Sequence, residues 1–212
     1  MIVVGLTGSI GMGKSTAAAV LRRAGIPVHD ADAAVHVLFA RDGAAVAPVE
    51  AAFPGVSRDG AIDRRALGAR VFGDPAALAR LEAIVHPLVQ ARTRAFLRAA
   101  ALRRAPLVVL DVPLLFEAGR VADCDAVIVV SAPAFLQAQR VLRRPGMTPA
   151  RLSDILSRQM PDREKRRRAD FVVTTGLGRR QSLRALLRAV KLLRGHGRPD
   201  RRTLWMSLFD HA

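Results

Sequence analysis

Residues Gly8 to Ser15 read GSIGMGKS, which is the complete pattern G-x-x-x-x-G-K-[ST] of a phosphate-binding loop. An apolar, β-branched run at 2–6 precedes the loop, and a run of helix formers at 16–21 follows it. Strand, glycine-rich loop and helix in this order are the context that distinguishes a nucleotide site from a chance glycine turn. The stretch therefore predicts an α/β fold that binds a nucleoside triphosphate.

Each part of this loop has a chemical use. Glycines let successive backbone N–H groups turn inward around an anion, and the N-terminus of the following helix adds the positive end of its dipole. Lys14 is expected to reach the terminal phosphates, and the Ser15 hydroxyl is expected to bind Mg²⁺. The loop thus predicts both ATP and Mg²⁺ as cofactors.

The composition is that of a globular chain. It has 212 residues, 50% of them hydrophobic, and a net charge of +16. No run of about 18 apolar residues occurs, so we expect no membrane span. The chain starts with a strand instead of the basic and apolar regions of a signal peptide, and its single cysteine, Cys124, has no partner for an internal disulfide. We therefore expect a cytoplasmic enzyme.

The positive charge is concentrated in one part of the chain. Residues 140–202 hold 19 basic and 5 acidic side chains, whereas 1–139 hold 15 and 12. Such a segment can bind nucleic acid or a polyanionic small molecule, or simply form solvated helices. Aromatic residues, which usually accompany basic ones in single-strand sites, make up only 4% of the chain. We expect no nucleic-acid partner, although charge alone leaves a nucleic-acid-binding ATPase open.

Apolar runs alternate with helical stretches along the chain. The predicted strands are 2–6, 26–28, 107–110, 126–130 and 171–173. The predicted helices are 14–24, 31–40, 63–71, 75–104, 133–143, 149–160 and 180–194. Continuous apolar strands separated by helices are typical of a parallel sheet that is covered on both faces.

Two insertions interrupt this alternation within a single domain, 1–194. The predicted parts are a core at 1–32, 105–139 and 169–194, a helical insertion at 33–104, an arginine-rich insertion at 140–168 and a poorly ordered tail at 195–212. Ligands of open α/β sheets lie beyond the carboxyl ends of the strands. We therefore expect the insertions to form a substrate cap and a lid.

Acidic residues follow two of the predicted strands. Asp32 lies just past the second strand, where it can accept the proton of a phosphoryl acceptor's hydroxyl or help hold Mg²⁺. Asp is also a preferred helix N-cap, and we expect Asp30 to act as one. Asp111 directly follows the strand at 107–110, which is the Walker B pattern of a Mg²⁺ ligand. Glu117 can orient substrate or water, or it can be a surface residue.

Basic residues supply the remaining candidates. Arg140, Arg143 and Arg144 open the second insertion, and a lid arginine can neutralise charge on a phosphoryl group in transfer. Most arginines there are expected to be solvated, and spacing does not select among them. Arg64 and Arg65 can receive a phosphate or face solvent.

Several short motifs together resemble the dephospho-CoA kinase family, from Ile2 to about Leu193. They are GLTGSIGMGKST at 5–16, DAD at 30–32, DRRAL at 63–67, HPLV at 86–89, VPLLFEAG at 112–119, QRVLRRPGMT at 139–148, RQM at 158–160 and RADFVV at 168–173. The loop is common to many families, whereas the combination of DAD, HPLV and VPLLFE is far more specific.

The resemblance implies ATP-dependent phosphorylation of the ribose 3′-hydroxyl of dephospho-CoA, giving coenzyme A and ADP. It also implies a P-loop NTPase fold: a doubly wound, five-stranded parallel sheet with a helical CoA-domain insertion and a helical lid. We expect a monomer or a weak homo-oligomer. The residues it places around the ATP phosphates are Gly11, Met12, Gly13, Lys14, Ser15 and Thr16. At the acceptor it places Asp32, His86 and the stretch from Leu114 to Glu117, with Arg140 in the lid. We add Arg65 as a candidate for substrate binding.

The sequence departs from the family at two places. Ser9 stands where glycine is common, and Thr174-Thr175-Gly176 follows the last strand in place of an Asp-Asn sequence. The second departure leaves open how the adenine is bound.

Other functions compete with this reading. Another nucleoside, nucleotide or small-molecule P-loop kinase is the alternative enzyme. A guanine-nucleotide switch normally reads its base with Asn-Lys-x-Asp, and this chain contains no asparagine. A dinucleotide-binding oxidoreductase would need glycine at Thr16.

Overall fold

The computed structural model describes residues 1–196, so the predicted tail at 195–212 lies almost entirely outside the described residues. The chain divides into two compact units. Unit 1 consists of Met1–Val28 together with the chain from Arg103 onward, and unit 2 consists of His29–Leu102. Each unit is described by itself.

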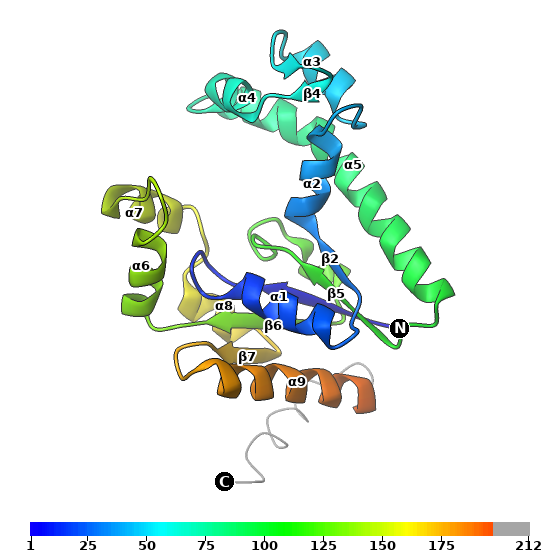
Figure 1. Cartoon of the computed structure of the whole chain (residues 1–212), viewed down its shortest axis with the longest axis vertical. Helices are drawn as coiled ribbons and strands as arrows, with labels where there is room; N and C mark the ends of the chain where they lie inside the picture. The colour runs from blue at the N-terminus through cyan, green and yellow to red at the C-terminus, as the bar shows by residue number, and fades with distance from the viewer. Residues whose placement is uncertain (197–212) are drawn as a thin grey trace. The chain divides into compact units, whose positions relative to one another are not determined.

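A five-stranded sheet forms the centre of the fold, in the order β2-β5-β1-β6-β7 (Figure 1). Its strands are β1 (Ile2–Thr7), β2 (Val28–Asp30), β5 (Leu107–Asp111), β6 (Ala126–Ser131) and β7 (Phe171–Thr174). β1 pairs in parallel with β5 on one side and β6 on the other, and β6 pairs in parallel with β7. The predicted parallel α/β fold is confirmed.

The second strand begins two residues later than predicted. The prediction placed it at 26–28, whereas β2 is Val28–Asp30. Pro27 has no N–H to donate to a ladder, although its carbonyl oxygen accepts a hydrogen bond from Val109 N at 2.9 Å. The strand therefore ends at the acidic residue Asp30.

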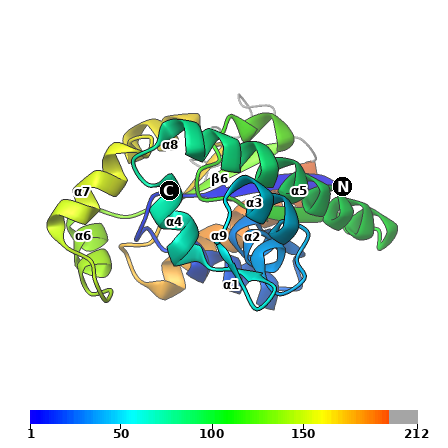
Figure 2. The same ribbon diagram turned by 90° about the horizontal axis from the view of Figure 1, so that it is seen from above.

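Helices cover both faces of the sheet in unit 1. They are α1 (Lys14–Arg23), α6 (Ala134–Leu142), α7 (Pro149–Ser157), α8 (Asp162–Arg168) and α9 (Arg179–His196), with a 3₁₀ turn at Arg120–Asp123. α1 and α9 pack against each other on one face, and α8 lies against β6 (Figure 1). α6 and α7 lie side by side (Figure 2).

The core of unit 1 lies between the sheet and the helices α1 and α9. Alternate residues of the strands, such as Leu6 and Ile128, are fully buried there against Leu21 of α1 and Leu193 of α9. Every residue of β5 is buried, and so is every residue of β6, because the opposite face of the sheet is covered too. This two-sided burial explains why the strands read as unbroken apolar runs.

The helix prediction is wrong in one part of unit 1. A single helix was predicted at 149–160, but α7 ends at Ser157 and a separate helix, α8, follows at Asp162–Arg168. The α8 sequence, DREKRRR, has no apolar period that would reveal a helix. Its acidic first turn and basic last turn both suit the helix dipole.

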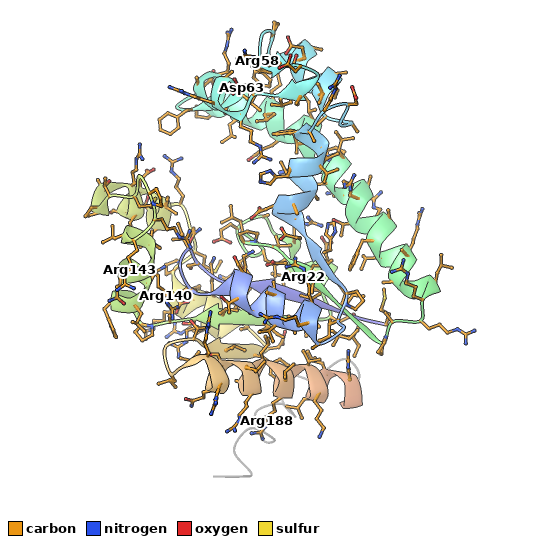
Figure 3. All side chains as sticks on the ribbon, in the orientation of Figure 1. Arg22, Arg58, Asp63, Arg140, Arg143 and Arg188 are labelled. Atoms are coloured by element: carbon orange, nitrogen blue, oxygen red, sulfur yellow. The ribbon has the colours of Figure 1, made fainter. Side chains whose placement is uncertain are left out.

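Unit 2 is mostly helical. Its elements are α2 (Ala31–Phe39), α3 (Val46–Ala52), β3 (Ser57–Arg58), β4 (Ala61–Ile62), α4 (Arg64–Val71) and α5 (Pro75–Leu102). The helices α2, α3 and α4 all pack against the long helix α5. The Asp30 side chain accepts a hydrogen bond from Ala33 N at 3.0 Å, so the predicted N-cap of α2 is confirmed. Asp63 caps α4 in the same way (Figure 3).

Three elements of unit 2 were not predicted. α3 was missed, and so was the hairpin of β3 and β4, which turns at Asp59 and Gly60 with φ of 51° and 77°. Asp-Gly with two positive φ values is a favoured two-residue hairpin turn. Among the described residues, no helix is both long and apolar enough to span a bilayer.

Candidate nucleotide-binding site

The glycine-rich loop connects β1 to α1 and is tightly packed from behind. Gly11 and Gly13 have φ of 76° and 97°, which side chains rarely adopt. A Cβ atom added to Gly11 would lie 2.5 Å from Val141 Cγ2 and 3.1 Å from Gln137 O, both on α6. The loop therefore needs glycine at this position for its conformation and also for its contact with α6.

Met12 and Ser9 are buried parts of the same loop, with exposures of 2% and 4%. The Met12 sulfur lies 3.0 Å from Ala132 N, just beyond β6. The buried Ser9 is accommodated where the family commonly has glycine, and Ser9 O accepts a hydrogen bond from Met12 N at 3.2 Å. The loop backbone is thus held by its own turn and by the end of β6.

Lys14 and Asp111 form an ion pair at the carboxyl ends of β1 and β5. The Lys14 Nζ atom lies 2.6 Å from Asp111 Oδ1, and the two side chains are 15% and 3% exposed. Asp111 is the last residue of β5, and Lys14 is the first residue of α1. The structure therefore brings together the two residues that the sequence assigned to phosphate and metal binding.

The donors near the loop suit Mg²⁺. Ser15 and Thr16 are exposed in the first turn of α1, and Asp111 contributes a carboxylate. Mg²⁺ prefers such oxygen ligands and is usually bound by one or two carboxylates together with substrate phosphates and water. The described residues contain no group of three or more His, Cys, Asp or Glu side chains that would hold a metal alone. The site accordingly fits a metal that binds together with the nucleotide.

Arg140 lies on α6 (Figure 3), and it contacts the loop directly. Its Nη1 atom donates to Gly11 O at 3.3 Å and to Thr175 Oγ1 at 3.0 Å, and its Nη2 atom donates to Thr175 O at 2.9 Å. Arg143 and Arg144, by contrast, are exposed. Among the three arginines considered at the start of this insertion, the structure therefore singles out Arg140.

Three loop contacts were missed by the sequence analysis. Gln137 Nε2 donates to Ile10 O at 2.8 Å, Ile10 N donates to Gln159 Oε1 at 3.1 Å, and Thr175 Oγ1 donates to Met12 O at 2.7 Å. A glutamine within a helix carries no sequence signal of such a role. The signals present were indirect: Gln159 belongs to the RQM motif, and Thr175 marks a departure from the family.

Glu117 is tied to the segment that returns from α7. Its Oε1 atom accepts a hydrogen bond from Met160 N at 2.8 Å and lies 2.8 Å from Lys165 Nζ. Burial by itself would raise the pKa of Glu117, but hydrogen bonds from Lys165 and from the Met160 backbone outweigh it and lower this pKa below its usual value. These contacts give Glu117 a structural role, while its role at the acceptor stays a prediction.

The predicted acceptor residues of unit 2 lie on three helices. Asp32 is on α2, Arg65 on α4 and His86 on α5, and all three are exposed. The neighbouring Arg64 is engaged within the unit, because its Nη1 atom lies 3.0 Å from His36 Nε2. Arg64 and Arg65 are both exposed, so exposure does not distinguish them.

Leu114, the remaining acceptor candidate, is 44% exposed in the loop after β5, in unit 1. An apolar side chain of this exposure at the carboxyl end of the sheet is compatible with a ligand contact. The roles of Leu114, Asp32, Arg65 and His86 stay predictions.

The matching family model and the curated relatives agree on one family. A family model described as dephospho-CoA kinase matches residues 2–178. A dephospho-CoA kinase of Rhodospirillum rubrum is 62% identical over 202 residues, which cover 95% of this chain and 96% of that protein. One of Paramagnetospirillum magneticum is 70% identical over 166 residues, which cover 78% of each.

Solved structures show the same fold. A crystal structure of a Thermus thermophilus protein has a TM-score of 0.78 and 38% identity, with 90% of this chain and 96% of that one covered. A dephospho-CoA kinase from Campylobacter jejuni has a TM-score of 0.68 and 23% identity over 90% and 96% of the two chains. The second likeness supports the fold alone.

Proposed function

The chain belongs to the dephospho-CoA kinase family, and we propose that it phosphorylates the ribose 3′-hydroxyl of dephospho-CoA with ATP at the loop between β1 and α1. The observation that carries the proposal is the Lys14–Asp111 pair, with its 2.6 Å contact beside the glycine-rich loop. A lysine and an acidic residue in this relation serve to bind the phosphates and the metal of a nucleotide.

The loop binds the polyphosphate in this proposal. Residues Gly11 to Thr16 surround the phosphates, to which the loop presents backbone N–H groups, and the N-terminus of α1 adds its dipole. Lys14 neutralises charge on the terminal phosphates, and Arg140, on α6, neutralises charge on the phosphoryl group in transfer. Ser15 and Asp111 would hold Mg²⁺, which supplies charge neutralisation on the phosphate oxygens when bound.

Asp32 acts on the acceptor. It follows β2 closely, and its exposed carboxylate is available to a hydroxyl group. We assign Asp32 to accept the proton of the ribose 3′-hydroxyl as that oxygen forms a bond to the γ-phosphorus and the bond to the bridging β–γ oxygen breaks. The products are coenzyme A and ADP.

Further residues bind dephospho-CoA without taking part in the chemistry. Arg65 and His86 of unit 2 are exposed polar groups suited to phosphate and ribose. Leu114 offers an exposed apolar contact after β5, and Glu117 lies in the same loop. We also propose a cytoplasmic enzyme that is a monomer or a weak homo-oligomer.

The activity is tested with two acceptors in parallel. ADP production is coupled to NADH oxidation in the presence of Mg²⁺ and ATP, with dephospho-CoA in one series and adenylate in the other. Turnover with dephospho-CoA and a product that carries phosphate on its 3′-oxygen support the proposal. Faster turnover with adenylate would assign the chain to the alternative nucleotide kinases.

Asp32→Asn tests the acceptor base. Loss of general-base catalysis typically lowers kcat by about 10²–10⁴-fold, whereas the affinity for ATP measured by calorimetry is expected to remain close to wild type. Asp42→Asn is the matched control, because Asp42 is an exposed acid of the same unit with 88% side-chain exposure. Near-normal turnover of the Asp32 variant would remove this residue from the role.

A further inference from the structure

Three consecutive carbonyl groups of the phosphate loop accept hydrogen bonds from side chains outside the loop. The pairs are Gln137 Nε2 to Ile10 O at 2.8 Å, Arg140 Nη1 to Gly11 O at 3.3 Å and Thr175 Oγ1 to Met12 O at 2.7 Å. A fourth contact involves the other end of the Ile10 residue, because Ile10 N donates to Gln159 Oε1 at 3.1 Å. The backbone of the loop is thus held by side chains at every residue from 10 to 12.

These side chains come from distant parts of unit 1. Gln137 and Arg140 lie on α6, Gln159 follows α7, and Thr175 follows β7. Gln137 is only 6% exposed. Gln137 precedes α7 in the chain and Gln159 follows it, so residues on either side of α7 contact Ile10.

The direction of a peptide carbonyl fixes the direction of the next N–H group, because the trans peptide is planar and the two groups point opposite ways. A donor on Ile10 O therefore orients the N–H of Gly11, and a donor on Met12 O orients the N–H of Gly13. Neither N–H donates to a protein acceptor among the described residues, whereas Met12 N donates to Ser9 O within the loop. The side-chain contacts thus turn the carbonyl groups of Ile10 and Met12 to one side of the loop and leave the Gly11 and Gly13 N–H groups on the opposite side.

An anion site needs this selection. A carbonyl oxygen that turned toward a polyphosphate would repel it, whereas N–H groups attract it. We propose that Gln137, Gln159 and Thr175 are positioning residues for phosphoryl transfer, which keep the loop carbonyls turned away from the ATP phosphates and the Gly11 and Gly13 N–H groups turned toward them. The inference rests on the proposed nucleotide site and extends it to residues that hold the backbone of the loop.

Thr175 is suited to this role by its hydroxyl group. The Oγ1 atom accepts a hydrogen bond from Arg140 Nη1 at 3.0 Å and donates its single proton to Met12 O at 2.7 Å. The alternative acceptor, Ser131 O, lies at 3.4 Å. The hydroxyl therefore links the lid arginine to the loop, and an isosteric valine would remove both contacts without changing the shape.

Two glutamine-to-glutamate variants separate the loss of a hydrogen bond to the loop from the effect of an added negative charge. Gln137→Glu removes the N–H donor to Ile10 O and leaves two oxygens facing that carbonyl. Gln139→Glu adds the same charge at an exposed position of the same helix, α6. Binding of ATP with Mg²⁺ is measured by calorimetry, and KM values for ATP and for dephospho-CoA are measured separately, with a thermal melt for each variant.

The expected results differ between the variants. Loss of one such hydrogen bond is expected to lower the affinity for ATP about tenfold. Gln137→Glu and Thr175→Val are therefore each expected to weaken ATP binding by about this factor. Both variants are expected to raise the KM for ATP and to leave the KM for dephospho-CoA unchanged. Gln139→Glu is expected to stay near wild type, and Thr175→Ser is expected to restore the affinity that Thr175→Val loses.

Three outcomes would overturn the inference. They are ATP affinities of Gln137→Glu and Thr175→Val equal to wild type, equal increases of the two KM values, or failure of Thr175→Ser to restore binding in a folded protein. Absence of ATP binding by the wild-type chain would instead overturn the proposed function itself. Thr175→Val provides the decisive result if Gln137→Glu fails to fold.

Discussion

The Nζ atom of Lys165 lies 2.8 Å from Oε1 of Glu117, and the Lys165 side chain has no exposure to solvent. The described residues supply no other polar partner for this ammonium group. Glu117 differs, because its side chain keeps 18% of its exposure and also accepts a hydrogen bond from Met160 N. The pair joins α8 to the loop after β5. Lys165 depends on Glu117 to compensate its buried charge, whereas Glu117 also has solvent and the Met160 N–H.

This difference predicts that Glu117→Gln and Lys165→Met lower the free energy of unfolding by different amounts. Glu117→Gln leaves a buried ammonium group beside a neutral amide, and we expect it to lower the free energy of unfolding by about 3 kcal/mol, the low end for a broken buried pair. Lys165→Met leaves a carboxylate that retains water and a backbone N–H, so its cost is expected to be smaller. Urea unfolding at pH 7 measures both, and a larger cost for Lys165→Met would contradict the asymmetry.

The same pair predicts how stability depends on pH. The pKa of Glu117 is lowered in the folded chain from 4.5, mainly because hydrogen bonds from Lys165 and Met160 outweigh the effect of burial. A lowered carboxylate pKa contributes stability that is fully present above the unfolded pKa and is lost as pH falls through the folded pKa. The difference in Tm between wild type and Glu117→Gln is expected to be constant above about pH 6 and to narrow below about pH 4.5. A difference that widens in acid would show that the sign is wrong.

Cys124 is expected to be unreactive in the native chain. Burial is the main cause that raises the pKa of its thiol to about 12, and the adjacent Asp123 adds to the effect. Only the thiolate reacts with disulfide reagents, and a free cysteine has a pKa of about 8.5. At pH 8, the native thiol is therefore expected to react with Ellman's reagent about a thousandfold more slowly than the thiol of the urea-unfolded chain. Equal rates would mean that the thiol is accessible and ionised.

The sequence could predict the elements whose signals are local. The loop from Gly8 to Ser15, the buried strands β5 and β6, and the Asp30 cap all follow from residues that are neighbours along the chain. α8 could not be found in this way, because its seven residues contain no apolar period.

The contacts behind the loop could not be predicted for a different reason. Gln137 and Ile10 are 127 residues apart, and Gln159 and Ile10 are 149 residues apart. Spacing within one segment says nothing about hydrogen bonds at such separations. Only the fold brings α6 and the end of α7 to the loop, so side chains of ordinary type acquire a role that their local sequence does not signal.

A comparison of two glycines isolates the packing of the loop from its backbone conformation. Gly11 and Gly25 have nearly the same φ, 76° and 73°, but an added Cβ would lie 2.5 Å from Val141 Cγ2 at Gly11 and would meet nothing within 4 Å at Gly25. Gly25→Ala is therefore expected to cost only the backbone strain, about 1 kcal/mol. Gly11→Ala carries the same strain and a clash with α6, which adds about 1–3 kcal/mol.

Val141→Ala in the Gly11→Ala background should relieve part of the clash, because it removes the Cγ2 atom, whereas the contact with Gln137 O at 3.1 Å remains. Urea unfolding measures the free energy of unfolding of four proteins: the wild type, Gly25→Ala, Gly11→Ala and the double variant with Val141→Ala. Calorimetry with ATP and Mg²⁺ measures the affinity of the loop for ATP. We expect Gly25→Ala to bind ATP normally and Gly11→Ala to lose affinity, since a shift of the loop away from α6 also weakens the contacts of Gln137 and Arg140 with it. Equal stabilities and equal ATP affinities for the two alanine variants would mean that α6 yields freely to the loop, and the packing argument would then fail.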